Sequence, residues 1–221
     1  MPHAFSAARR QFLELATASG LTVAGAGLWL AGSAGAARAA DDNVSPADLM
    51  AEMPLPDCWI GNADAPVTIV EYASMTCPHC AAFHAETFAK LKSDYLDTGK
   101  ARFTLREFPL DPLATAAFML ARRAGDDQRN AMVDLLFAKQ KDWAYAEKKI
   151  EALASIVKQA GLTQADFENC LKDQALYDKV NKMRDIADQK FKVQSTPTFF
   201  FNGKRHGGGF GPEELATLVK A

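Results

Sequence analysis

The sequence predicts an α/β fold in which a β-α-β unit and a later β-β-α unit flank an all-helical insertion. Three observations predict it. The apolar, β-branched run Val67–Tyr72 stands directly before a Cys-Pro-His-Cys motif that opens a helical pattern. Residues 111–191 carry helical patterns throughout. Strand character then returns at Thr198–Phe201, just before Asn202-Gly203, a pair that favours a tight hairpin turn.

In the first unit, Val67–Tyr72 is expected to be a buried parallel strand because it is mostly apolar and β-branched. One helix is then expected from the cysteine motif to about Asp97, ended by Gly99. Its apolar residues recur near helical spacing at Phe83, Phe88, Leu91 and Tyr95. Residues 101–108 form the second strand. This order places the two cysteines at the junction of a strand and a helix.

The central block is predicted to hold five helices, which cover residues 112–125, 127–141, 147–160, a short stretch after Thr163, and 174–190. Thr163 and Asp166 have the spacing of a capping box, in which each residue bonds the other's backbone amide. After the Asn202-Gly203 hairpin, Pro212 opens a terminal helix, because proline suits the first helical turn.

The composition argues against several classes of function. A chain of 221 residues has room for one medium domain with a sizeable insertion. Its formal net charge of −2 gives no basic excess, so nucleic acid is not expected as a partner. Four cysteines are too few for a disulfide scaffold, and they do not form the two paired clusters of a structural zinc site.

Residues 1–39 have the composition of an export signal. Arg9-Arg10 precedes a weakly apolar run, and Ala37-Arg38-Ala39 is a small-x-small cleavage pattern. The paired arginines resemble a twin-arginine signal, although Glu14 stands where such signals carry lysine. A plain secretory signal and a membrane anchor are the alternatives. Either export route ends outside the cytoplasm, where disulfides persist. Residues 40–57 are expected to be an extended or briefly helical lead-in.

The Cys77-Pro78-His79-Cys80 motif carries the chemistry. A sulfur at a helix start faces unpaired amides and the positive end of the helix dipole, which stabilise its thiolate. A stabilised thiolate is a good leaving group, so the oxidised pair readily donates its disulfide. His79 can lower the thiol pKa further. Cys77 is expected to be exposed, and Cys80, one turn later, to be shielded by Phe83 and the loop of Pro197. Zinc or copper(I) binding is the alternative, but zinc needs four ligands.

Residues Glu71–Cys80, together with Ser195-Thr196-Pro197-Thr198-Phe199-Phe200, resemble the DsbA family of periplasmic thiol:disulfide oxidoreductases, in particular its alphaproteobacterial branch. The resemblance covers residues 57–221. It implies a thioredoxin fold, formed by residues 58–110 and 192–221 and interrupted by a helical domain at 111–191. It also implies a periplasmic dithiol oxidase that needs no cofactor and no metal, works as a monomer on reduced exported proteins, and is recycled by a quinone-linked membrane partner such as DsbB.

The same resemblance assigns further site residues. Pro197 is expected to be the cis-proline that faces the disulfide, and Thr196 to pair with an extended substrate and to touch the Cys77 sulfur. Glu71 is the buried acid that exchanges protons with Cys80. His84 replaces the family's second acid, which weakens the expectation of a buried charge network. Arg106, on the neighbouring strand, is expected to pair with Glu71.

Cys58 and Cys170 are expected to be buried free thiols, because Arg123 occupies the position at which relatives supply a disulfide partner to Cys170. A Cys58–Cys170 bridge is the alternative. Two other functions stay open for the whole chain. A disulfide isomerase or reductase of the same fold would use the same motif, and a copper(I)-handling module would bind metal through the cysteine pair.

Overall fold

The structure, a computed structural model, describes residues 43–220, which belong to one compact unit. The expected signal at residues 1–39 and the start of the lead-in lie outside the described residues. Five strands form one sheet in the order β1-β3-β2-β4-β5. Their bounds are β1 Ile60–Gly61, β2 Val67–Ala73, β3 Ala101–Glu107, β4 Thr198–Phe201 and β5 Lys204–Gly207. Strands β2 and β3 are parallel, and the other pairs are antiparallel.

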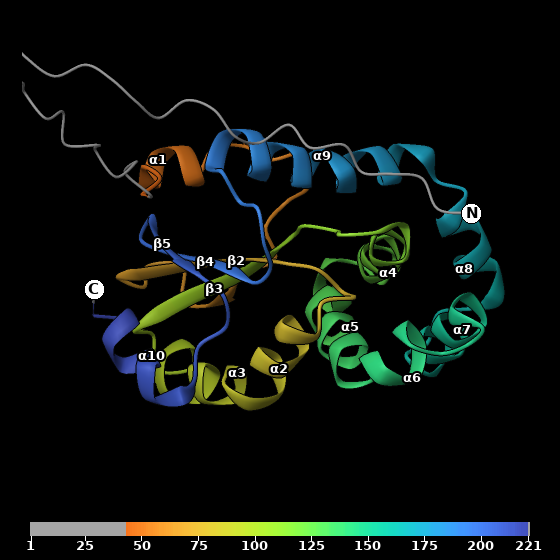
Figure 1. Ribbon diagram of the computed structural model, residues 1–221, viewed down its shortest axis with the longest axis horizontal. Helices are drawn as coiled ribbons and strands as arrows, with labels where there is room; N and C mark the ends of the chain where they lie inside the picture. Colours follow the sequence, from red (N-terminus) through yellow and green to blue (C-terminus); the bar gives the residue numbers. More distant parts are fainter. Residues whose placement is uncertain (1–42, 221) are drawn as a thin grey trace, which may run out of the picture. The chain divides into compact units, whose positions relative to one another are not determined.

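The helices of the described residues follow the expected order. Their bounds are α1 Pro46–Leu49, α2 Pro78–Glu86, α3 Phe88–Leu91, the π-helix η1 Lys92–Leu96, α4 Pro112–Arg123, α5 Asp126–Ala138, α6 Gln140–Ala144, α7 Lys149–Gln159, α8 Gln164–Leu171, α9 Gln174–Phe191 and α10 Pro212–Leu218. Helices α4 to α9 stand between β3 and β4 in the chain, as an all-helical insertion into the α/β fold (Figure 1).

Two faces of the sheet pack against different helices (Figure 1). Alternate residues of a strand point to opposite faces. Ile69, Phe199 and Phe201 therefore join the large core that contains α2, α3, α10 and the insertion helices. Val70, Tyr72 and Phe200 join a second cluster with residues of α1 and α9. Glu71 lies on the face of Ile69 and Phe199, which directs its carboxylate towards α2.

The expected single helix from the motif to Asp97 is wrong. The chain breaks at Thr87 and continues as α3 and then as the π-helix η1. The Thr87 hydroxyl is buried and donates a hydrogen bond to the carbonyl oxygen of Phe210 at 2.8 Å, across to the loop before α10. This tertiary bond explains the break, since hydrophobic spacing carries no information about it. The second predicted helix of the block is likewise two helices, α5 and α6, which meet at Lys139.

The turn and cap signals are confirmed. Thr163 and Asp166 form a complete capping box at the start of α8. Asn202 and Gly203 both adopt positive φ, 49° and 89°, in the β4–β5 hairpin. Gly203 is required there for a second reason: the carbonyl of Val44 lies so close that an added Cβ would meet it at 2.1 Å. The lead-in is held at this point by a Val44 N–H bond to the Gly203 carbonyl.

Candidate active site

Cys77 is the N-cap residue of α2, with extended backbone dihedrals and Pro78 at the first helical position. The sequence forms this start because proline needs no intrahelical amide partner there. Both Cys77 and Cys80 are free thiols, so the structure describes the reduced state. The residue Cys77 is 4% exposed and Cys80 is fully buried. The expectation of an exposed Cys77 is therefore wrong, although it remains the more accessible sulfur of the two.

The surroundings of Cys77 favour its thiolate. The Cys80 thiol, which donates a hydrogen bond to it, has the largest effect on its pKa. Burial opposes that effect, while the Thr196 hydroxyl and the backbone amides of Cys80 and His79 reinforce it. The result is a pKa lowered to about 5. Cys77 is thus ionised at neutral pH, as expected for a sulfur at a helix start.

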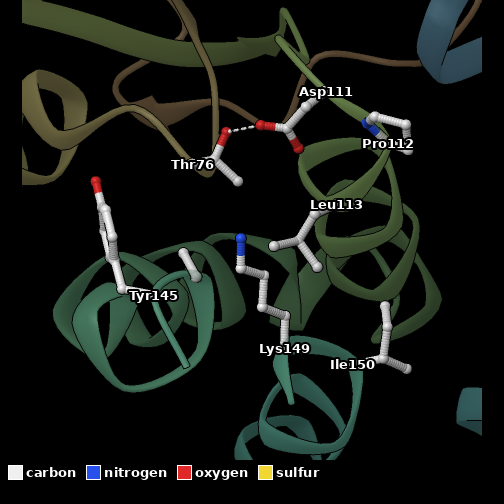
Figure 2. A pocket seen from close by; sticks show the side chains of 8 residues that line it. Thr76, Asp111, Pro112, Leu113, Tyr145, Lys149 and Ile150 are labelled. Atoms are coloured by element: carbon white, nitrogen blue, oxygen red, sulfur yellow. Dashed lines mark hydrogen bonds between the residues drawn. The ribbon is translucent and has the colours of Figure 1, made fainter. Parts of the chain in front are cut away.

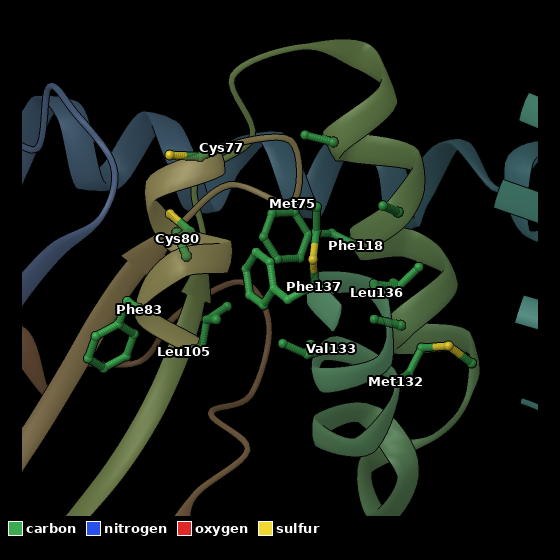
Figure 3. Close-up of a cluster of buried hydrophobic side chains, with 14 of the residues drawn as sticks. Met75, Cys77, Cys80, Phe83, Leu105, Phe118, Met132, Val133, Leu136 and Phe137 are labelled. Carbon is green, nitrogen blue, oxygen red and sulfur yellow. The ribbon is translucent and has the colours of Figure 1, made fainter. Parts of the chain in front are cut away.

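Cys80 is shifted in the opposite direction. Burial is the main cause that raises its pKa, followed by the hydrogen bond it donates to Cys77 and by the negative charge of Glu71. Its thiol therefore stays protonated throughout the physiological pH range. Figure 3 shows both sulfurs beside the hydrophobic core, with the Phe83 ring on the same helix. One sulfur of the pair carries charge and the other carries the proton.

The loop before β4 faces Cys77. The Thr196–Pro197 peptide bond is cis, as the resemblance implied. In the thiol form, Cys77 Sγ donates to the Thr196 carbonyl oxygen at 3.3 Å. The Thr196 hydroxyl is buried and has no hydrogen-bond partner among the described residues. It is therefore free to donate to the Cys77 thiolate. A Cβ added at Gly209 would lie 3.9 Å from the His79 carbonyl, so this glycine brings a second loop close to the motif.

Glu71 is fully buried and pairs with His84, not with the expected Arg106. The Glu71 Oε2–His84 Nε2 distance is 2.9 Å, and the His84 side chain is 5% exposed. In the strand register, Glu71 faces Leu105, whereas Arg106 faces Tyr72 on the other side of the sheet. Arg106 instead donates to the Tyr72 hydroxyl at 3.0 Å and binds Asp57 at 2.7 and 2.8 Å. The alternation of β-strand side chains explains the error.

His84 forms a buried charge network with Glu71, so the expectation that its presence weakens such a network is wrong. Burial lowers its pKa, but the charge of Glu71 and the contacts with Asp134 and Glu71 outweigh this and raise the pKa to about 9. Its Nδ1 lies 3.7 Å from Asp134 Oδ1, an ion-pair distance, and the Asp134 side chain is 54% exposed. The imidazole also stacks on Phe137 at 4.5 Å. His84 thus links the carboxylate under Cys80 with a carboxylate at the surface.

Sequence reasoning missed a group of residues that hold the loop before Cys77. The buried Gln140 side chain, from α6, donates to the carbonyl oxygens of Met75 and Cys77 at 2.8 and 2.9 Å. Thr76 donates to Asp111 at 2.6 Å, the acid that also caps α4. Side chains of the insertion therefore fix the active-site loop. No local pattern marks them, because glutamine in a helix has no specific signature; only the fold brings them here.

The remaining motif positions and cysteines have simpler environments. Pro78 and His79 are exposed beside Cys77. Cys58 and Cys170 are buried free thiols, as expected, and no bridge joins them. Burial raises the pKa of both, that of Cys170 to about 11. Residues 43–220 contain no group of three or more His, Cys, Asp and Glu side chains that could hold a metal ion.

Comparisons with known proteins agree with this geometry. A sequence profile of the thioredoxin family matches residues 55–221. A Rickettsia bellii protein, named as a protein-disulfide oxidoreductase, is 34% identical over 148 residues, which are 66% of this chain and 57% of that protein. The Bacillus cereus protein named as disulfide bond formation protein D is 32% identical over 151 residues, 65% of this chain and 69% of the relative.

A solved structure matches the fold over most of the chain. Wolbachia pipientis alpha-DsbA1 superposes with a TM-score of 0.72 and 30% identity, covering 80% of this chain and 94% of that one. The chain spans less than two thirds of the length of the rickettsial relatives it matches. Within the described part of the chain, every helix is too short or too polar to cross a membrane.

Proposed function

The chain belongs to the thioredoxin family, with DsbA-type proteins among its relatives, and on this premise we propose that it is a dithiol oxidase that donates its Cys77–Cys80 disulfide to exported proteins. One observation carries the proposed direction: the two sulfurs are shifted in opposite directions, with the pKa of Cys77 lowered to about 5 and that of Cys80 raised. Stabilising a thiolate stabilises the reduced state, which makes the disulfide a stronger oxidant.

The reaction starts when a substrate thiolate attacks the Cys77 sulfur of the disulfide. The bond between the cysteines breaks, Cys80 leaves as a thiolate, and it takes up a proton because its buried site disfavours charge. The second substrate thiol loses its proton and attacks the substrate sulfur of the mixed disulfide. Cys77 then leaves as a stable thiolate. The substrate loses two electrons and two protons, the cysteine pair gains the electrons, and one of the protons stays on Cys80.

Glu71 and His84 are proposed to supply the proton that Cys80 needs. Glu71 is buried and its charge is felt at Cys80. Its carboxylate is bonded to the His84 imidazole, which is close to Asp134 at the surface. An imidazole can accept a proton on one nitrogen and release one from the other. Protons can thus reach the buried sulfur without exposing it to water.

Thr196 and Pro197 are proposed to receive the substrate backbone next to Cys77 by strand addition. The proposed substrates are reduced exported proteins, and a quinone-linked membrane oxidase of the DsbB kind re-forms the disulfide. Residues 1–39 would direct the chain to the periplasm, where it would work as a monomer. The oxidising chemistry of that compartment suits a disulfide donor.

The test is the redox equilibrium of the Cys77–Cys80 pair with glutathione. After acid quenching, alkylation and mass measurement of each mixture, we expect the pair to be half reduced at a potential well above the roughly −270 mV of thioredoxin. A value at or below that potential would contradict the oxidase reading and support a reductase. Copper bound in a 1:1 ratio after reducing purification would support the copper(I)-handling alternative instead.

A further inference from the structure

A cavity of about 650 Å³ opens beside the loop that carries Cys77 (Figure 2). It lies where that loop meets the start of α4 and the segment from α6 to α7. Its lining residues are Thr76, Asp111, Pro112, Leu113, Ala144, Tyr145, Lys149 and Ile150. A volume of this size is within the roughly 300–1,000 Å³ range of ligand-binding sites in proteins.

The walls of the cavity combine apolar surface with one cation. Tyr145 is 60% exposed and Ile150 is 48% exposed, unusually high values for side chains of this kind. Figure 2 shows the Lys149 side chain between Tyr145 and Leu113, with its amine directed towards Thr76. Within the described part of the chain, the amine of the Lys149 side chain makes no hydrogen bond or ion pair. The site thus presents a large apolar surface and a cation without a protein partner.

The negative charge of Asp111 in the same cavity is already engaged. One of its carboxylate oxygens accepts from the Thr76 hydroxyl at 2.6 Å, and the other accepts from the Ala114 amide at 2.8 Å. Asp111 is the N-cap of α4, where the helix dipole favours an anion. These bonds fix the Asp111 carboxylate at the start of α4, so Lys149 is the charged side chain of the cavity that has no hydrogen-bond partner among the described residues.

The cavity adjoins the residue that precedes the reactive cysteine. Thr76, which lines it, directly precedes Cys77 in the chain. The Cys77 sulfur is bonded on its other side to Thr196 and points away from α4 (Figure 3). A polypeptide that crosses Cys77 along the Thr196 loop therefore extends at one end towards the Thr76 side.

We propose that this cavity is a subsite for the substrate polypeptide, which takes a large apolar side chain and a neighbouring carboxylate close to the attacked cysteine. The apolar side chain packs against Tyr145, Leu113 and Ile150, and the carboxylate pairs with Lys149. The subsite rests on the proposed function, because it selects among thiol substrates. It gives the chain a preference for cysteines flanked by an aromatic or aliphatic residue and an acid.

The experiment uses single-cysteine peptides that differ only in the two residues that flank the cysteine. These pairs are Phe and Glu, Phe and Lys, or Ser and Glu. Stopped-flow measurement follows mixed-disulfide formation with the oxidised full chain. We expect the Phe-Glu peptide to react about two- to fivefold faster than Phe-Lys, the size of an exposed ion pair. It should react about tenfold faster than Ser-Glu, because burying an aromatic side chain contributes at least that much.

Lys149→Glu should reverse the order of the Phe-Glu and Phe-Lys peptides, and Tyr145→Ser should reduce the preference for phenylalanine. Lys158→Glu is the matched control, since this lysine is exposed at the other end of α7 and outside the cavity. It should keep the wild-type order. High salt should reduce the rate difference between the Phe-Glu and Phe-Lys peptides, because it screens the charge of Lys149, and should leave the preference for phenylalanine unchanged.

A small uncharged thiol, β-mercaptoethanol, separates the subsite from the redox function. It has neither an apolar side chain nor a carboxylate to place in the cavity, so wild type, Lys149→Glu and Lys158→Glu should react with it at equal rates. Equal rates with this thiol and no peptide preference in wild type, or a preference unchanged by Lys149→Glu, would overturn the subsite while leaving the oxidase intact. A glutathione equilibrium as reducing as that of thioredoxin would overturn the proposed function itself.

Discussion

The thiolate of Cys77 should make the stability of the reduced protein depend on pH in a defined direction. The perturbation is acidification of the reduced chain from pH 7 to pH 4, compared with the same titration of Cys77→Ser. The pKa of Cys77 is lowered from an ordinary 9.0 to about 5 in the folded state. Between these values the unfolded chain binds more protons than the folded one, so stability rises with pH.

The size of this stability change follows from the pKa shift of Cys77. A pH of 7 is about two units above the pKa of the Cys77 thiol in the folded chain, whereas the same thiol is still protonated in the unfolded chain. Since each unit corresponds to about 1.4 kcal/mol, the thiolate contributes about 2.7 kcal/mol at pH 7. The contribution grows to about 5 kcal/mol at pH 9, and it disappears as the pH falls through the folded pKa of about 5. The raised pKa of Cys80 adds almost nothing below about pH 8, because that thiol is neutral in both states there.

Other groups titrate in the same range, so the variant is required as a reference. The pKa of His84 is raised to about 9, so its contribution is fully present below the ordinary 6.5 and is lost as the pH rises through 9. That slope has the opposite sign to the slope of Cys77 above pH 6.5. Subtracting the Cys77→Ser curve cancels it, because His84 is present in both proteins.

The assay is urea unfolding under a phosphine reductant at several pH values, with the rate of iodoacetamide alkylation of Cys77 as a second readout. The stability difference between wild type and Cys77→Ser should shrink by about 2.7 kcal/mol between pH 7 and pH 4. The alkylation rate should fall with a midpoint near the folded pKa. A difference that stays constant with pH, or an alkylation midpoint near 9, would refute the reasoning. The same free energy makes the disulfide about 60 mV more oxidising at pH 7.

Three further variants test the neighbours of the sulfurs. Glu71→Gln should slow peptide oxidation and shift its pH dependence, because proton delivery to Cys80 is impaired; an unchanged pH–rate profile would count against the relay. Thr196→Val should raise the pKa of Cys77 by up to about one unit, the value of a lost hydrogen bond to the thiolate, measured from its alkylation profile. Gln140→Ala should lower the free energy of unfolding by about 1–3 kcal/mol, because two buried carbonyls lose their donor, as urea unfolding would detect.

Local patterns predicted most of the fold. The β-branched run before the motif, the capping box at Thr163 and the Asn202-Gly203 hairpin each depend on residues close in sequence, and all three appear in the structure. The break at Thr87 was not predictable in this way. It depends on a bond to the Phe210 carbonyl, 123 residues away in the chain. Hydrophobic spacing continues across the break, so the sequence pattern alone favours one helix.

The candidate site was likewise predictable only where it depends on residues close in sequence. The lowered pKa of Cys77 was predictable from the motif, since the hydrogen bond from Cys80, its largest cause, and those from the helix-start amides all come from residues within the motif. The partner of Glu71 does not follow, because it depends on the strand register. In that register Arg106 lies beside Tyr72 on the far face of the sheet. His84 could have been found from its position on α2, where it lies one turn after Cys80 on the side that packs against the sheet and α5.

The opposite shifts of the two sulfurs have one structural origin. Cys77 lies at the end of an extended segment, where several donors point at its sulfur. Cys80 lies one turn deeper, where burial, the Cys77 sulfur and the charge of Glu71 outweigh a backbone hydrogen bond at Ser74 and raise its pKa. A carboxylate beneath Cys80 disfavours a second negative charge there, so the thiolate released by the first attack cannot persist and must be protonated. Once protonated, Cys80 donates its hydrogen to Cys77 and lowers the pKa of that thiol. Protonation of the buried cysteine thus makes the other a better leaving group, and the two halves of the exchange are coupled through a single proton.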